Sequence, residues 1–226
     1  MKKVRVWDLP VRLFHWALAV LIVAAVVTQN IGGNAMEWHF RAGYSILALL
    51  AFRIVWGLIG PRYARFSSFI YGPSTIVGYV RGGKEALKRK YLGHNPLGSL
   101  SVFALLGAVL AQAVSGLYAN DDIASEGPLV KFISKDLSDQ ITWFHKDVSA
   151  TLIYILVAMH ILAIIFYHVR RRQNLVKPML TGDHEVDFDA VPANDSWGMR
   201  LLAAVILALC AAAVYWLISL PPRGMM

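Results

Sequence analysis

The chain has 226 residues, 57% of them hydrophobic and only 16% charged, with a formal net charge of +8. Soluble domains are about half apolar and about a quarter charged, so this composition indicates an integral membrane protein. It excludes a disordered chain, a collagen-like repeat and, with Cys210 as the single cysteine, a disulfide scaffold. In a membrane protein an excess of positive charge reflects orientation in the bilayer, so no nucleic-acid partner is expected.

Five stretches are apolar enough to cross a membrane, for which a helix needs about 20 mainly apolar residues. They cover residues 11–27, 40–59, 97–118, 148–169 and 199–220. The first begins too late for a secretory signal peptide and lacks a small-residue cleavage motif, so it is interpreted as an anchor. The pattern predicts an all-α integral membrane protein, a four-helix transmembrane bundle followed by a fifth, C-terminal transmembrane helix.

Basic residues are distributed unevenly between the loops. All but five of the 22 lysines and arginines precede the first span, lie between the second and third, or follow the fourth. Because cytoplasmic loops carry the excess of Lys and Arg, the amino terminus is expected in the cytoplasm and, with five spans, the carboxyl terminus outside. The five exceptions are Arg41, Lys131, Lys135, Lys146 and Arg223.

The loops suggest three parts of the chain. Residues 1–182 form the four-helix domain, 183–198 an acidic linker, and 199–226 the appended helix and tail. The linker is expected to be solvated. The connection over 60–96 is expected to contain a short interfacial helix near residues 73–90, and the outer connection over 119–144 is acidic.

Four of the seven histidines lie in or at the ends of predicted spans, where ionisable residues are costly and indicate function. His15 opens the first span and therefore lies toward the cytoplasm, whereas His39 opens the second span on the outer side. The fourth span runs inward, with His145 near the outer surface. His160 follows 15 residues later, roughly 22 Å deeper and about 60° away around a regular helix.

These histidines form two pairs at two depths: His39 with His145 outside, and His15 with His160 inside. Two b-type haems stacked across a membrane need this arrangement, because each iron takes one imidazole from each side, from facing helices. The haems would be non-covalent, because no Cys-x-x-Cys-His motif is present. A hydrogen bond between helices is the alternative for any single histidine. Zinc is disfavoured, because no cysteine or carboxylate completes a tetrahedral set.

Other residues are compatible with the same cofactors. Arg53 lies about 21 Å deeper than His39 on the same helix and could pair with a propionate of the inner haem, or instead snorkel to the interface. Gly43 lies one turn from His39, where a missing side chain would let a flat macrocycle approach. His94 and His168 are possible alternative inner ligands, propionate partners or parts of a quinone pocket, or simply interfacial residues.

Glycines on the third predicted span could admit a macrocycle in the same way. They are Gly107 and Gly116, and the favoured interpretation is ordinary helix packing, since glycine is common in membrane helices.

The motif Val6-Trp7-Asp8-Leu9-Pro10-Val11-Arg12-Leu13-Phe14-His15-Trp16 resembles the opening of the bacterial cytochrome b561 family, which includes the cytochrome b subunits of nickel-iron hydrogenases. The resemblance covers about residues 4–182. It implies a four-helix core whose haem ligands match His15, His39, His145 and His160, with an arginine late in helix two at Arg53. Further matching motifs are His39-Phe40-Arg41-Ala42-Gly43, Ala64-Arg65-Phe66, Gly93-His94-Asn95-Pro96-Leu97-Gly98, Asn174-Leu175-Val176-Lys177-Pro178-Met179 and Thr181-Gly182.

The resemblance implies a multi-pass protein of the bacterial inner membrane that exchanges electrons with quinones and with hydrogenases, superoxide or cytochromes c. We expect transmembrane electron transfer through two stacked haems between a quinone pool and an outer partner, either a periplasmic cytochrome c or a redox-enzyme subunit. The haem does the chemistry, so no side chain is assigned a catalytic role. The acidic outer loop, with Asp121, Asp122 and Glu126, could dock a basic cytochrome c or could simply be solvated.

Two alternative functions remain open from the sequence. One is a stand-alone superoxide or quinone oxidoreductase, which would be active without a partner subunit. The other is a membrane anchor subunit in which haem is structural, a role that the appended helix would suit.

Overall fold

The computed structural model describes residues 2–82, 91–123 and 125–221. By the density of its internal contacts the chain divides into two compact units. The first comprises Met1–Leu13, Arg53–Leu105 and Leu156–Ala203, and the second Phe14–Phe52, Leu106–Ile155 and Ala204–Met226.

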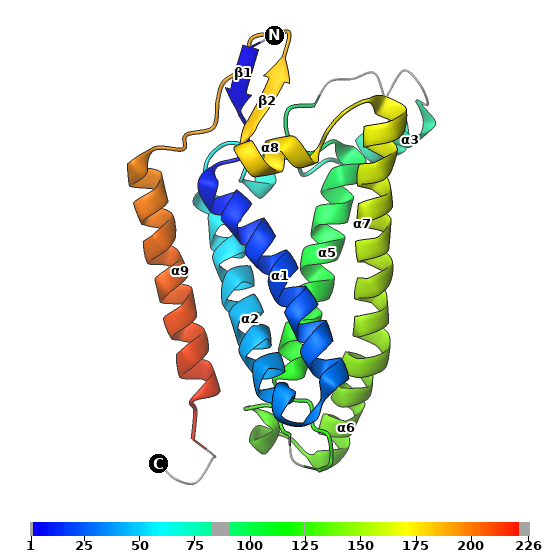
Figure 1. Cartoon of the computed structure of the whole chain (residues 1–226), viewed down its shortest axis with the longest axis vertical. Coiled ribbons are helices and arrows are strands. Elements are labelled where there is room, and N and C mark those ends of the chain that lie inside the picture. Colours follow the sequence, from blue (N-terminus) through cyan, green and yellow to red (C-terminus); the bar gives the residue numbers. More distant parts are fainter. Residues whose placement is uncertain (1, 83–90, 124, 222–226) are drawn as a thin grey trace. The chain divides into compact units, whose positions relative to one another are not determined.

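Long helices dominate the described residues, as the sequence predicts (Figure 1). Five helical stretches in this part of the chain are long and apolar enough to cross a membrane, which confirms the all-α membrane fold class. The helices are α1 (Leu9–Ile31), α2 (Met36–Ile59), α5 (Pro96–Gly116), α7 (Ala150–Arg171) and α9 (Trp197–Ile218). A short 3₁₀ turn, Gly33–Ala35, joins α1 to α2.

The fourth helical stretch is longer than predicted. Helix α6 (Lys135–Trp143) leads through a π-helical turn (Phe144–Ser149) directly into α7, so the stretch covers Lys135–Arg171. Part of the predicted outer connection over 119–144 is therefore helical. The Ser134 side chain begins α6 by accepting a hydrogen bond from the Leu137 N–H at 3.3 Å.

The acidic stretch 183–198 is more ordered than a solvated linker. Its first residues form strand β2 (Asp183–Val186), which pairs antiparallel with β1 (Lys2–Arg5), as Figure 1 shows. Helix α8 (Val176–Thr181) precedes β2 and ends at Gly182, whose φ of 88° is left-handed and favours glycine. The sequence pattern gave no alternation long enough to predict so short a strand pair.

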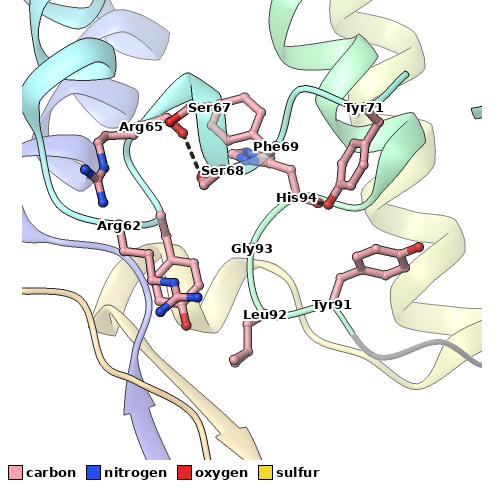
Figure 2. Close-up of a pocket in the computed structure, with 11 residues that line it drawn as sticks. Arg62, Arg65, Ser67, Ser68, Phe69, Tyr71, Tyr91, Leu92, Gly93 and His94 are labelled. Atoms are coloured by element: carbon pink, nitrogen blue, oxygen red, sulfur yellow. Dashed lines mark hydrogen bonds between the residues drawn. The ribbon is translucent and has the colours of Figure 1, made fainter. Parts of the chain in front are cut away.

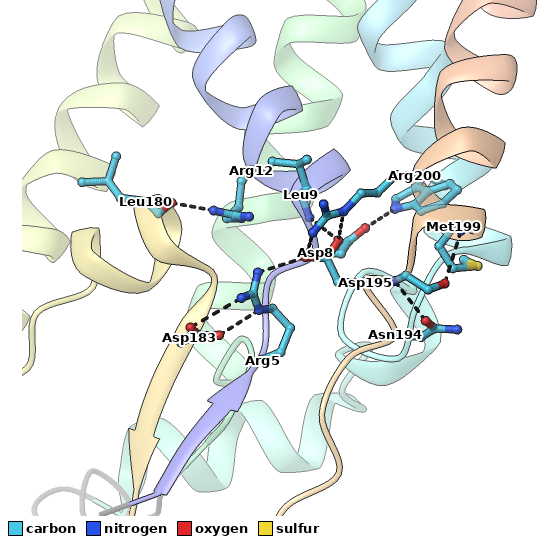
Figure 3. Close-up of polar contacts among 12 residues, drawn as sticks. Arg5, Asp8, Leu9, Arg12, Leu180, Asp183, Asn194, Asp195, Met199 and Arg200 are labelled. Carbon is cyan, nitrogen blue, oxygen red and sulfur yellow. Dashed lines mark hydrogen bonds and ion pairs between the residues drawn. The ribbon is translucent and has the colours of Figure 1, made fainter.

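Asp195 anchors the end of the same stretch (Figure 3). Its carboxylate accepts a hydrogen bond from the Leu9 N–H at 3.1 Å and pairs with Arg5 at 2.9 Å and Arg200 at 3.0 Å. Burial alone would raise the pKa of Asp195, but these hydrogen bonds and positive charges hold it below its ordinary value. The stretch is thus fixed within the first unit to the chain near the starts of α1 and α9.

The first unit has an aromatic core around the end of α2. Trp56 is fully buried and Phe69 nearly so. Phe66, in the 3₁₀ turn Phe66–Ser68, packs where Gly57 has no side chain. Of the interfacial helix expected near 73–90, the structure shows α3 (Pro73–Arg81), and residues 83–90 lie outside the described part.

The second unit has a separate apolar core in which the appended helix takes part. Leu47 and Ala48 of α2 cluster with Leu117, Leu129 and Val214, the last of these on α9. The outer connection packs below this cluster through a 3₁₀ turn, Val130–Phe132.

Candidate functional site

His39 and His145 lie side by side in the second unit. His39 is in the first turn of α2 and His145 in the π-helical turn, and their ring centroids are 6.3 Å apart with perpendicular planes (86°). π-Helical turns are rare and are often found at functional sites. The pair predicted for the outer side is therefore brought together by the fold.

The spacing of the pair can be compared with what one iron requires. A coordinating imidazole nitrogen lies about 2 Å from its metal and about 1.1 Å from the centre of its own ring, so two imidazoles on opposite sides of one iron have centres about 6 Å apart. The observed 6.3 Å fits this requirement.

Main-chain carbonyls orient both imidazoles. His39 Nδ1 donates to the Ala25 carbonyl of α1 at 2.9 Å, and His145 Nδ1 donates to the Gln112 carbonyl of α5 at 3.0 Å. A carbonyl only accepts, so each proton is on Nδ1 and each Nε2 keeps its lone pair. Metal-binding histidines characteristically donate their second nitrogen in this way. Segments of four helices thus converge on the pair.

Gln112 and Ser115 are further members of this site that the sequence did not single out. The Ser115 hydroxyl lies 3.0 Å from His145 Nδ1, and the Gln112 side-chain amide lies 3.1 Å from His145 Nε2. The lone pair of Nε2 accepts from this amide. A metal bound at His145 would replace that hydrogen bond.

Two glycines leave space next to the histidines. A Cβ built on Gly116 would lie 2.9 Å from His145 Cε1, so the imidazole occupies the position that a side chain would fill. The sequence favoured ordinary helix packing for this glycine. At Gly43, one turn from His39, a Cβ would have no atom within 4 Å, which is compatible with the approach of a flat macrocycle.

The inner candidates lie on α1 and α7. His15 belongs to the second unit, where its ring contacts Trp16 edge-on at 5.0 Å, and His160 belongs to the first. Their pairing stays a prediction.

Arg53 is buried rather than exposed, with 4% of its surface accessible, so it does not snorkel into solvent. Its guanidinium lies 4.6 Å from the centre of the Phe66 ring, and its buried Nη1 has no hydrogen-bond partner within the described part of the chain. A buried guanidinium with an unused donor fits an anionic group such as a haem propionate.

Asp8 is a buried carboxyl that the sequence analysis quoted only as part of a motif. Trp56 Nε1 donates to it at 2.8 Å. Burial raises the pKa of Asp8 to about 6, while the Trp56 hydrogen bond and the positive charge of Arg53 act in the opposite direction. The Trp7-Asp8 motif thus caps the buried end of α2 in the first unit.

Of the two secondary histidines, only His94 is enclosed. Its ring packs against Trp7 and Phe69, with centroids 4.8 and 4.6 Å away. Burial, assisted by the charges of Arg53 and His160, lowers the pKa of His94 to about 3, so the ring is neutral. His168 is exposed near the end of α7 and is not part of the cluster.

The chain matches the family described as prokaryotic cytochrome b561 over residues 6–182. Among curated relatives, the probable Ni/Fe-hydrogenase B-type cytochrome subunit of Azotobacter vinelandii is 28% identical over 214 residues, covering 79% of this chain and 87% of the relative. The subunits of the same name from Bradyrhizobium diazoefficiens and Rhodobacter capsulatus are each 24% identical, covering 80% and 83% of this chain and 86% and 84% of the relatives. No solved structure matches the chain significantly.

Proposed function

Because the chain belongs to the prokaryotic cytochrome b561 family, and is thus a multi-pass membrane b-type cytochrome of electron transport, we propose that it carries electrons across the membrane through two b haems. In this proposal the outer haem is held by His39 and His145, and the inner haem by His15 and His160. Bound haem supplies one-electron transfer, and the protein sets its position and potential.

The arrangement of His39 and His145 carries the proposal. Two imidazoles 6.3 Å apart, each anchored through Nδ1 to a carbonyl of another helix, present two lone pairs without any rearrangement of the backbone. Such anchoring fixes ring orientation and increases the basicity of the ligand. A hydrogen bond between helices, the alternative for a lone histidine, would not require two rings to be oriented in the same manner.

Arg53 supports the inner site. A buried cation without a carboxylate partner at hydrogen-bond distance in the described residues is costly, and a propionate would compensate it. Arg53 would thereby favour the reduced or oxidised state of the inner haem through its charge. His94, neutral and packed between aromatic rings, is the reserve candidate for this region.

The proposed electron donor or acceptor on one side is a membrane quinone, and the proposed partner on the other is a redox-enzyme subunit on the outer face. The relatives named as hydrogenase cytochrome subunits support this kind of partner. The basic loops support a cytoplasmic amino terminus and a periplasmic carboxyl terminus in the inner membrane.

The acidic outer loop gives less support to a basic cytochrome c. Asp121 accepts hydrogen bonds from the N–H groups of Ile123 and Ser125 at 3.0 and 2.8 Å, and Lys135 pairs with Asp122. These carboxylates already have partners within the chain. The observations therefore favour a redox-enzyme subunit over a soluble cytochrome.

Electron transfer across sealed proteoliposomes tests this function. Vesicles containing the holoprotein, with ferricyanide trapped inside, are supplied with a quinol outside, and reduction of the trapped acceptor is followed. The wild type and the exposed control His168→Ala should reduce it, and His39→Ala should lose at least tenfold in rate. Equal rates for His39→Ala and the wild type would contradict a conduit and favour an anchor with structural haem.

A further inference from the structure

A pocket of about 520 Å³ opens in the first unit between the chain that follows α2 and the chain that precedes α5 (Figure 2). One wall comes from the segment 62–71, and the other from residues 91–94. This pocket is not among the groups assigned to haem above.

The pocket wall is basic and contains no carboxylate. Arg62 and Arg65 both line it, together with Ser67 and Ser68. Neither arginine forms an ion pair with any residue in the described ranges, and both are exposed. The pocket therefore offers two free guanidinium groups in a concave site, the chemistry that recognises phosphate.

The tyrosines of the pocket are already committed within the chain. The Tyr63 hydroxyl donates to the Val191 carbonyl at 2.8 Å, and the Tyr71 hydroxyl donates to the His94 carbonyl at 2.9 Å. These bonds tie the pocket wall to neighbouring segments and make its shape a fixed feature of the unit. The donors left for a ligand are the arginines and Ser67.

The position of the pocket indicates where its ligand comes from. Arg62 follows the end of α2 by three residues and His94 precedes α5 by two, so the pocket lies where two apolar helices end. Exposed apolar side chains accompany it: Ile70, 64% exposed, lies between two lining residues, and Val77 and Val80 of α3 are 44% and 59% exposed. A basic cavity beside exposed apolar groups at helix ends matches a lipid, with its phosphate in the cavity and its chains alongside.

We propose that this pocket binds the phosphate group of an anionic membrane lipid, through Arg62 and Arg65. The site is independent of the haem ligands and of the proposed electron-transfer function. A bound lipid would fix the segment 62–71 against residues 91–94 at the level of the membrane surface.

The test uses delipidated holoprotein in detergent and short-chain phosphatidylglycerol with a fluorescent acyl chain as the probe. Binding is measured for the wild type, for the double variant Arg62→Gln/Arg65→Gln, and for the matched control Arg81→Gln/Arg170→Gln, which changes two exposed arginines of the same unit outside the pocket. Short-chain phosphatidylcholine and inorganic phosphate are added as competitors. Haem content is recorded for each variant.

We expect the pocket variant to bind phosphatidylglycerol at least roughly tenfold more weakly, and the control to bind within about twofold of the wild type. Neither competitor should displace the probe at equal concentration. Equal weakening in both double variants would overturn the proposal, because it would show a diffuse surface effect. Complete displacement by phosphate at the same concentration would assign the site to a free anion. Loss of haem from the pocket variant with retained lipid binding would assign the arginines to the cofactor and also overturn it.

Discussion

His145 shows how single residues shape the proposed outer haem site. Its ring is held by the Gln112 carbonyl and the Ser115 hydroxyl, and it fills the space left by Gly116. The histidine itself was predictable, because an ionisable residue in an apolar span is costly. Its neighbours were not, since a glutamine, a serine and a glycine in a membrane helix have many ordinary uses and only three-dimensional contacts distinguish them.

A prediction at Gly116 tests this packing. In Gly116→Ala the new methyl group would lie 2.9 Å from His145 Cε1, so the imidazole must shift away from the position set by its hydrogen bonds. We expect the outer haem to dissociate at least about fivefold more readily, measured by transfer of haem to an apoprotein acceptor. Gly107→Ala on the same helix is the control, because a Cβ there meets no atom within 4 Å. Equal effects of the two substitutions would argue against the packing described.

The buried carboxyl of Asp8 predicts a pH dependence. Its pKa is raised from 3.8 to about 6, so between these values the folded protein keeps a proton that the unfolded chain loses. Stability contributed by this group is therefore lost as pH rises from about 4 to 6, by about 3 kcal/mol.

Asp8→Asn keeps an acceptor for Trp56 and removes the titration. We expect its melting temperature relative to the wild type to rise across pH 4 to 6, as followed by thermal unfolding in detergent. A difference between the two proteins that stays constant over this range would contradict the assignment of a raised pKa to Asp8.

At the scale of elements, the long helices were predictable and their irregularities were not. Apolar runs of about 20 residues identify the spans, whereas the π-helical turn at Phe144–Ser149 has no sequence signal. The 60° separation inferred for His145 and His160 assumes a regular helix, and that assumption does not hold through this turn. Strands β1 and β2 have four residues each and depend on contacts between distant parts of the chain.

The anchoring of the acidic stretch gives a prediction at this scale. Asp195→Ala removes the acceptor of the Leu9 N–H and the partner of Arg5 and Arg200, so we expect the free energy of unfolding to fall by roughly 1–3 kcal/mol. Asp189→Ala is the control in the same stretch, since its ion pair with Lys2 is exposed and should change stability by less than about 0.5 kcal/mol. Thermal unfolding of both variants checks this. A solvated linker would instead give two equally small effects.

At the scale of the whole molecule, the fold class and the family were both predictable and are confirmed. Composition identified the membrane, and the histidine pattern with its flanking motifs identified the family. The number of haems, the quinone and the partner depend on groups outside the chain, so the residues support them only as proposals. Segment boundaries differed most where the chain is polar, because tertiary contacts rather than hydrophobic periodicity order the 119–144 and 183–198 stretches.

The most direct measurement is the haem content per polypeptide, with reduced-minus-oxidised spectra, for the wild type, His39→Ala, His160→Ala and the exposed control His168→Ala. The account predicts two non-covalent haems in the wild type and in the control, and one in each of the other two variants, with a different spectral component lost from each. A single haem in the wild type, or loss of the same component from His39→Ala and His160→Ala, would contradict the two-site arrangement.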